Sequence, residues 1–137
     1  MRALVLIPAL LATAALAADR PSGPERRQAE RVERIMAGRT AGQPTNCLPM
    51  LRNLNSERTP EGNIIYSRGR SATSEQTVWL NKPYGGCAPG RNDVAMVTQR
   101  PQNQACRGDI VQLFDPVTRI PYGACSLGDF VPYTRAK

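Results

Sequence analysis

Two Gly-Asp pairs placed shortly after cysteines are the residues of this chain best suited to chemistry. Asp109 ends the segment 106–109 (Cys-Arg-Gly-Asp), and Asp129 ends the segment 125–129 (Cys-Ser-Leu-Gly-Asp). Two carboxylates at a suitable separation can serve as acid and base on a glycosidic bond, provided that their turns lie side by side. Asp is also a frequent turn residue, because its carboxylate accepts backbone N–H groups. We favour the turn role for both, and keep a carboxylate-based glycan hydrolase as the alternative.

The sequence contains no histidine, and this absence narrows the possible chemistry. It excludes Ser-His-Asp and Cys-His arrangements, histidine metal sites and the usual general base near neutral pH. The chain also lacks a nucleotide-binding glycine motif and a calcium-binding loop. We therefore expect a non-enzymatic protein without a cofactor, which binds or supports another component of the cell envelope.

Four cysteines, Cys47, Cys87, Cys106 and Cys125, are distributed along the rest of the chain. An even number of cysteines in an exported protein predicts two disulfides. No Cys-x-x-C pair occurs, so neither a thioredoxin-type motif nor a zinc ribbon is indicated. A four-thiolate metal site is the rival interpretation, which we disfavour because thiols outside the cytoplasm tend to oxidise.

Four cysteines allow three pairings. We expect Cys47–Cys125 together with Cys87–Cys106, because closing a curled sheet would join its first strand to its last. The sequential pairing, Cys47–Cys87 with Cys106–Cys125, stays open. Loop-closure entropy of about 3–4.5 kcal/mol for each disulfide does not separate the two arrangements.

The first 17 residues have the three parts of a secretory signal peptide. Arg2 supplies the positive charge, residues 3–16 form an apolar run, and Ala15 and Ala17 occupy the small-residue positions of a cleavage site. We expect cleavage after Ala17 and a periplasmic or secreted mature protein of 120 residues (137 − 17). The apolar run is too short to span a bilayer comfortably, and no later segment is apolar enough to do so.

The formal net charge of +7 raises the question of an acidic partner. The positive residues are nearly all arginines, and they are scattered along the chain rather than clustered. No basic–aromatic motif is present, so nucleic acid is not indicated as a partner. A polyanion-binding protein remains an alternative if certain arginines share one face: Arg68, Arg70, Arg91, Arg100 and Arg107.

The mature chain divides into a polar leader at residues 18–46 and a β domain at 47–137. Ser22 and Glu25 form a potential capping box, which predicts a short helix at about 24–37. Residues 40–44 have the composition of a linker. The functional interpretation of this helix is a partner-binding arm, and the simpler one is a solvated leader helix.

Short runs of β-branched and aromatic residues, separated by Gly, Pro, Asn and Asp, predict the strands of the β domain. We expect strands at 63–68, 76–80, 94–98, 110–114 and 124–131. This pattern predicts a mainly β protein with a small antiparallel sheet or partly closed barrel, stapled by disulfides. Of the aromatic residues, Tyr66 and Trp79 should belong to the core, whereas Tyr84 and Tyr122 should be exposed in turns.

The cysteine motifs resemble a family of small exported proteobacterial proteins classed as a domain of unknown function. The resemblance rests on Cys47-Leu48, Leu80-Asn81, Gly86-Cys87, Cys-x-Gly-Asp-Ile at 106–110 and Cys-x-Leu-Gly-x-Phe at 125–130. It covers about residues 47–133, and the last two motifs are its most specific parts. It implies an exported location and a disulfide framework, and it brings no activity or functional residues with it.

Overall fold

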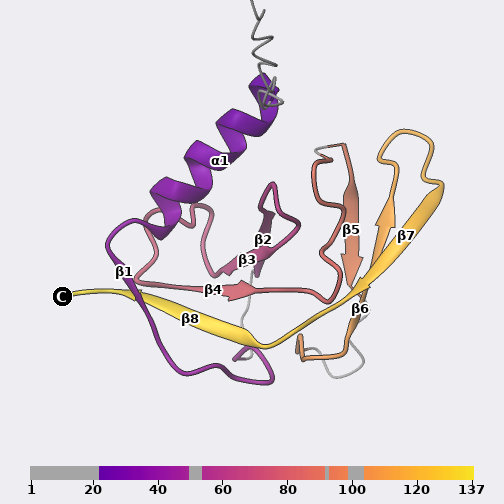
Figure 1. The fold of residues 1–137 in the computed structure, drawn as a ribbon. Helices are drawn as coiled ribbons and strands as arrows, with labels where there is room; N and C mark the ends of the chain where they lie inside the picture. Colours follow the sequence, from indigo (N-terminus) through magenta and orange to yellow (C-terminus); the bar gives the residue numbers. More distant parts are fainter. Residues whose placement is uncertain (1–21, 50–53, 92, 99–103) are drawn as a thin grey trace, which may run out of the picture.

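The computed structural model describes residues 22–49, 54–91, 93–98 and 104–137 (Figure 1). In these residues one helix is followed by eight strands, which form two antiparallel sheets. The predicted mainly β class with a short N-terminal helix is therefore confirmed. The expected barrel closure is not found, because the two sheets remain separate. The predicted signal peptide, residues 1–17, lies outside the described residues.

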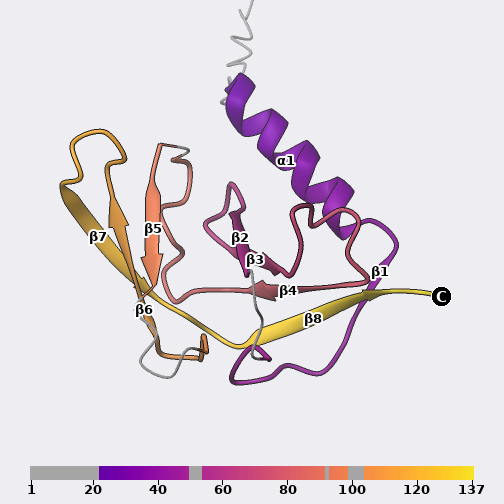
Figure 2. The same cartoon turned by 180° about the vertical axis from the view of Figure 1, so that it is seen from behind.

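Helix α1 (Gly23–Met36) begins at the predicted capping box. The backbone N–H of Ser22 donates to the Glu25 carboxylate at 2.7 Å, and the backbone N–H of Glu25 donates back to the Ser22 hydroxyl. Only the last turn of α1 is buried: Ile35 is fully covered and packs in a cluster with Ile65 and Val78. The helix therefore packs its C-terminal end on the protein, and Gln28 and Arg31 in its middle add polar contacts to Arg58 and Glu57. Its first turn extends away from the sheets (Figure 2).

The larger sheet contains five strands in the order β1-β8-β4-β3-β2. Their bounds are β1 (Arg39–Ala41), β8 (Phe130–Arg135), β4 (Thr77–Asn81), β3 (Ile64–Ser67) and β2 (Asn55–Arg58). Alternate residues of β3 and β4 point to opposite faces, as the two-residue period of a strand requires. Ile65 and Val78 face α1, whereas Ile64, Tyr66 and Trp79 belong to the main core on the other face.

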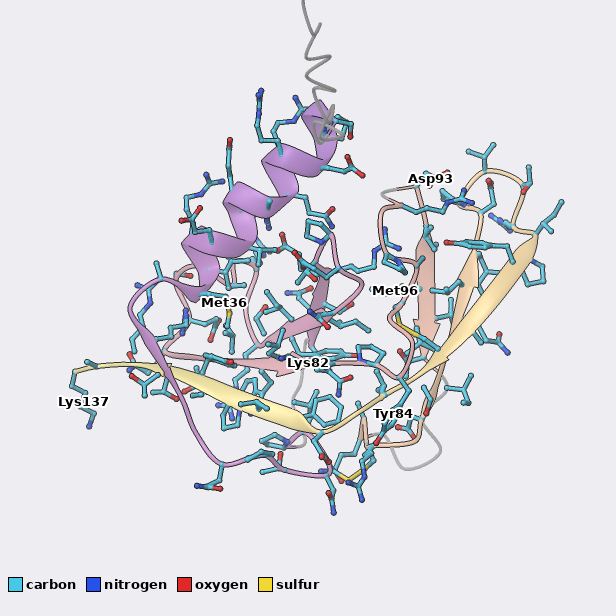
Figure 3. All side chains as sticks on the ribbon, viewed as in Figure 1. Met36, Lys82, Tyr84, Asp93, Met96 and Lys137 are labelled. Carbon is cyan, nitrogen blue, oxygen red and sulfur yellow. A yellow bond between two sulfur atoms is a disulfide. The ribbon has the colours of Figure 1, made fainter. Side chains whose placement is uncertain are left out.

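The smaller sheet contains β5 (Ala95–Thr98), β6 (Ile110–Phe114) and β7 (Pro121–Ser126), with β6 in the middle. Val111, Leu113 and Cys125 point from this sheet into the main core, where they meet Leu127 and Phe130. Met96 packs against the same core from β5 (Figure 3). The molecule thus has three layers: a helix end, a five-stranded sheet and a three-stranded sheet.

The predicted last strand, residues 124–131, is in fact parts of two strands. β7 ends at Ser126 in the smaller sheet, and β8 begins at Phe130 in the larger one. Asn81, fully buried on β4, fastens the corner between them: its amide donates to the Gly128 carbonyl at 2.7 Å and accepts from the Gly128 N–H at 3.0 Å. A Cβ at position 128 would collide with the Lys82 carbonyl oxygen, so the corner requires glycine.

The predicted linker at 40–44 is in part an edge strand. Residues Arg39–Ala41 form β1 and pair with β8, and Gly42 N–H continues the contact by donating to the Pro132 carbonyl at 2.7 Å. The Arg39 guanidinium holds the helix end to the sheet through backbone carbonyls of Ile35, Ala72, Glu75, Gln76 and Tyr133. Such long-range bonds cannot be recognised from a local composition of small and polar residues.

All four cysteines form disulfides, but the expected pairing is wrong, and so is the sequential alternative. The bonds join Cys47 to Cys106 and Cys87 to Cys125. Residues 46–48 run beside 105–107, where the Leu48 N–H donates to the Ala105 carbonyl at 2.9 Å. The expected pairing assumed that a single closed sheet would bring Cys47 to Cys125. Because the chain changes sheets after Cys125, this residue faces Cys87 across the core.

Candidate functional site

The two predicted carboxylates lie on neighbouring turns, each with a partner of its own. The Leu127 N–H donates to the Asp109 carbonyl, which brings the turn of Asp109 beside the corner that contains Asp129. The Asp109 carboxylate accepts the Cys106 N–H at 2.8 Å, as expected of a turn residue. Asp129 instead pairs with the Arg107 guanidinium at 3.1 Å. The turn role is therefore seen for Asp109, whereas the contact of Asp129 is an ion pair with a side chain. The hydrolase alternative stays an untested hypothesis.

The aromatic residues have the burial that the sequence predicts, but Tyr122 lies on strand β7 and not in a turn, because its segment pairs with β6. Tyr66 and Trp79 are nearly completely buried in the main core, and Tyr84 and Tyr122 are exposed. The Tyr122 ring carries the Arg91 guanidinium on its face, 4.7 Å from the ring centroid. Tyr122 is therefore part of a contact between β7 and the loop before β5 rather than an open platform for a ligand.

Of the arginines in the polyanion hypothesis, two line one cavity and two are paired with carboxylates. Arg91 pairs with Asp93 at 2.8 Å, and this contact lowers the pKa of the Asp93 carboxyl below its ordinary value. Arg107 is bound to Asp129 at a different corner. Arg68 and Arg70 do share a surface, because both line a cavity of about 360 Å³ with Asn55 and Gly69. Arg100 lies outside the described residues.

A buried arginine, which the sequence analysis did not single out, connects the two sheets. Arg58 ends β2, is only 7% exposed, and donates through its guanidinium to the Arg91 carbonyl. Burial lowers the pKa of Arg58 from its ordinary value, and the nearby Tyr122 and Asp93 partly oppose that effect. The backbone of Arg58 also accepts the Gln28 amide of α1. Arg58 thus holds helix, larger sheet and smaller sheet at one junction.

The outward face of the three-stranded sheet is the most distinctive surface of the described residues. Val111, Leu113 and Cys125 point inward, so their neighbours along the strands point away from the core. We call this surface the outer face, and it consists of Ala95, Val97, Ile110, Gln112, Phe114, Ala124 and Ser126. Five of these seven residues are apolar, and Val97 and Ile110 are 50% and 46% exposed. A face of this composition is typical of sheets that are covered on both sides.

A groove crosses one end of the outer face. It has a volume of about 380 Å³ and is lined by Ala95, Val97, Phe114, Asp115, Pro116 and Arg119. Its floor is therefore apolar and comes from two paired strands, and one end carries an acidic and a basic side chain. This combination can hold an aliphatic side chain and orient it through a charged neighbour.

The turn between β6 and β7 stands beside this groove and is rigidly formed. The Asp115 carboxylate accepts the backbone N–H groups of Val117 and Thr118 at 2.9 and 2.7 Å. These bonds hold the pKa of the Asp115 carboxyl below its ordinary value. The turn presents two bare aliphatic side chains to solvent, Val117 at 88% and Ile120 at 62% exposure.

The outer face could have been predicted from the sequence, although not from its candidate catalytic residues. In segment 110–114 (Ile-Val-Gln-Leu-Phe) apolar residues occur at both the odd and the even positions, and so on both sides of the strand, whereas a half-exposed strand alternates apolar with polar.

Among the described residues, no group of three or more His, Cys, Asp or Glu side chains is placed to hold a metal ion. In that same part of the chain, no helix has the length and apolarity needed to cross a membrane.

Comparison with known proteins adds no family to this description. The chain matches no protein-family model, no curated protein and no solved structure. The resemblance to the exported proteobacterial family stays a prediction from the motifs.

Proposed function

We propose that the mature chain is an exported, non-enzymatic protein–protein interaction domain of the cell envelope, which docks through the outer face. The observation that carries the proposal is the combination of half-exposed Val97 and Ile110 on one sheet face with an apolar groove that Val97 itself lines. Contiguous exposed apolar surface is uncommon on small proteins and marks places where another molecule binds. The groove is apolar and lies on a sheet face with further exposed aliphatic side chains, so the apolar surface extends beyond what one small molecule would cover.

The rigidity of the surrounding framework supports this assignment. The Cys87–Cys125 disulfide ties the inward side of β7 to the core, and the Asp115 turn fixes the adjoining loop. A surface that is already ordered loses little conformational entropy on binding, so more of the contact energy appears as affinity. The Arg58 junction adds to this order by holding the smaller sheet against the larger one.

The exported location is supported by three independent features. Residues 1–17 have the pattern of a signal peptide, both cysteine pairs lie at disulfide distance, and the motifs resemble an exported family. Disulfides persist in oxidising compartments such as the periplasm. We therefore place the binding event outside the cytoplasm.

The test is site-specific photo-crosslinking in cells that export the protein. A benzophenone side chain replaces Val97 on the outer face or, as the matched control, Ala41, which is exposed on β1 of the other sheet. We expect one defined protein adduct from position 97 and none from position 41. The adduct from position 97 should be lost when Ala95→Arg fills the groove. Equal adducts from both positions, or none from position 97, would contradict the proposal.

A polyanion-binding role is the second candidate, because Arg68 and Arg70 line one cavity. The arginine pair is tested with heparin as the probe. Arg68→Gln with Arg70→Gln should weaken binding and its salt dependence, whereas Arg27→Gln with Arg34→Gln on the exposed helix should not. Equal losses from both double variants would show only non-specific attraction by net charge.

A further inference from the structure

We propose that the partner on the outer face is a second copy of this chain, related by a two-fold axis that passes between the groove and the 115–120 turn. The inference rests on the proposed function and names the occupant of the same surface. In such a dimer each copy inserts its 115–120 turn into the groove of the other. The proposed dimer follows from two properties of the surface, its shape and its charge.

The shape of the surface is complementary to itself. The groove over Ala95 and Val97 is a hollow, and the turn beside it carries the projecting side chains of Val117 and Ile120. A two-fold axis brings a patch onto an identical patch, so a hollow and a projection side by side on one copy meet a projection and a hollow on the other. Aliphatic side chains that are now in water would then be buried on the apolar floor of the groove, which favours association.

The charges at the end of the groove follow the same symmetry. Asp115 and Arg119 both line it, and no ion pair of the Arg119 guanidinium occurs among the described residues. Across the axis, Arg119 of each copy would face Asp115 of the other, giving two equivalent ion pairs. Asp115 can accept this partner while it holds the turn, because a carboxylate has about four acceptor positions and the turn uses two.

The acidic group at the groove, Asp115, disfavours a lipid bilayer or an acidic polymer as the partner. The lowered pKa of Asp115 keeps that group ionised, and a bilayer on the groove would remove water from this charge without adding a cation to pair with it. An unrelated protein could supply the same contacts, and the experiment below separates it from a second copy.

The experiment measures the mass of the exported, oxidised chain by sedimentation and light scattering up to about 100 µM, which reveals a Kd in the micromolar range. We expect a dimer. Arg119→Glu places two acidic groups opposite each other, and Asp115→Lys places two basic groups opposite each other. Each variant alone should associate at least about tenfold more weakly, because like charges face each other across the interface.

An equal mixture of the two variants should restore the dimer, because both cross-axis pairs are then of opposite charge. A structural defect in either variant cannot produce this rescue. Circular dichroism and thiol titration check that both are folded and oxidised. Should Asp115→Lys fail to fold, Val97→Arg takes its place and should give a monomer, whereas Ala41→Arg on the other sheet should leave the dimer intact.

Three outcomes would overturn the inference. The first is that the wild type remains monomeric throughout the concentration range. The second is that Val97→Arg does not weaken the dimer. The third is that a mixture of the two charge variants does not form the dimer. The crosslinking experiment judges the proposed function separately. If the adduct at position 97 has the mass of a different protein, the outer face is a docking surface but the dimer is wrong.

Discussion

The side-chain amide of Asn81 binds both the N–H and the carbonyl of Gly128, 47 residues further along the chain. Asn81 is fully buried, and Gly128 lies at the corner where the chain leaves the smaller sheet for the larger one. The Asn81 side chain thus takes the place of a neighbouring strand, because it bonds the backbone of Gly128 between the end of β7 and the start of β8. Together with the shared core and the Cys87–Cys125 disulfide, this contact holds the two sheets in their relative position.

Asn81→Ala should lower the free energy of unfolding by about 1–3 kcal/mol, because the buried N–H and carbonyl of Gly128 lose their partner. Urea denaturation measures this as a lower midpoint. Asn46→Ala serves as the control, since that side chain is exposed. If both variants unfold at the same urea concentration, the Asn81 contact does not stabilise the corner.

Non-reducing peptide mapping of the exported protein should recover Cys47 linked to Cys106 and Cys87 linked to Cys125. Replacing Cys87 and Cys125 by serine should cost about 4 kcal/mol of stability on the loop-entropy model, since the bond closes a loop of 38 residues. A peptide that links the segments of Cys47 and Cys125 would refute the arrangement of the two sheets as well as the pairing.

Asp109→Ala should destabilise the protein by about 0.5–2 kcal/mol, by analogy with the loss of a capping acceptor, because the Cys106 N–H then loses its carboxylate partner. Asp129→Asn should cost less, about 0.2–1 kcal/mol, because its ion pair with Arg107 is largely exposed. Thermal melting of both variants measures the difference. A variant with unchanged melting that abolishes an activity on glycan would instead support the hydrolase alternative.

Acidification should weaken the 115–120 turn. The folded-state pKa of Asp115 is depressed, so its contribution is present above its unfolded-state pKa of about 3.9 and is lost as the pH falls through the folded value. Asp115→Asn can still accept the turn bonds but does not titrate. The melting temperature of the wild type should therefore fall further between pH 6 and pH 3, values chosen to bracket an ordinary Asp pKa of about 3.9, than that of the variant. Parallel curves would contradict this role of the ionised carboxylate.

Intact-mass measurement of the exported protein should give a mature chain that begins at Ala18. This expectation rests on Ala15 and Ala17 at the small-residue positions of the cleavage site. Recovery of the uncleaved chain from a periplasmic extract would contradict the predicted processing and would weaken the assignment of an exported location.

Features that depend on neighbouring residues could be predicted from the sequence. The Ser22–Glu25 capping box and the start of α1 are local, because their hydrogen bonds span three residues. Strands β3 to β6 were predicted within a residue or so at each end, because β-branched and aromatic side chains favour extended backbone wherever they fall. The presence of two disulfides could also be predicted, from the even number of cysteines together with the predicted signal peptide.

Features that depend on which segments meet in space were decided only by the tertiary structure. β2 has the polar sequence Asn-Ser-Glu-Arg and becomes a strand because it pairs with β3 and buries Arg58. The cysteines pair as they do because the chain changes sheets between Cys125 and Phe130, a turn fixed by the distant Asn81. The outer face is likewise decided by which segments meet in the tertiary structure. The sequence shows that both sides of segment 110–114 are apolar, but only the packing of Val111 and Leu113 into the core leaves Ile110 and Phe114 on the outside.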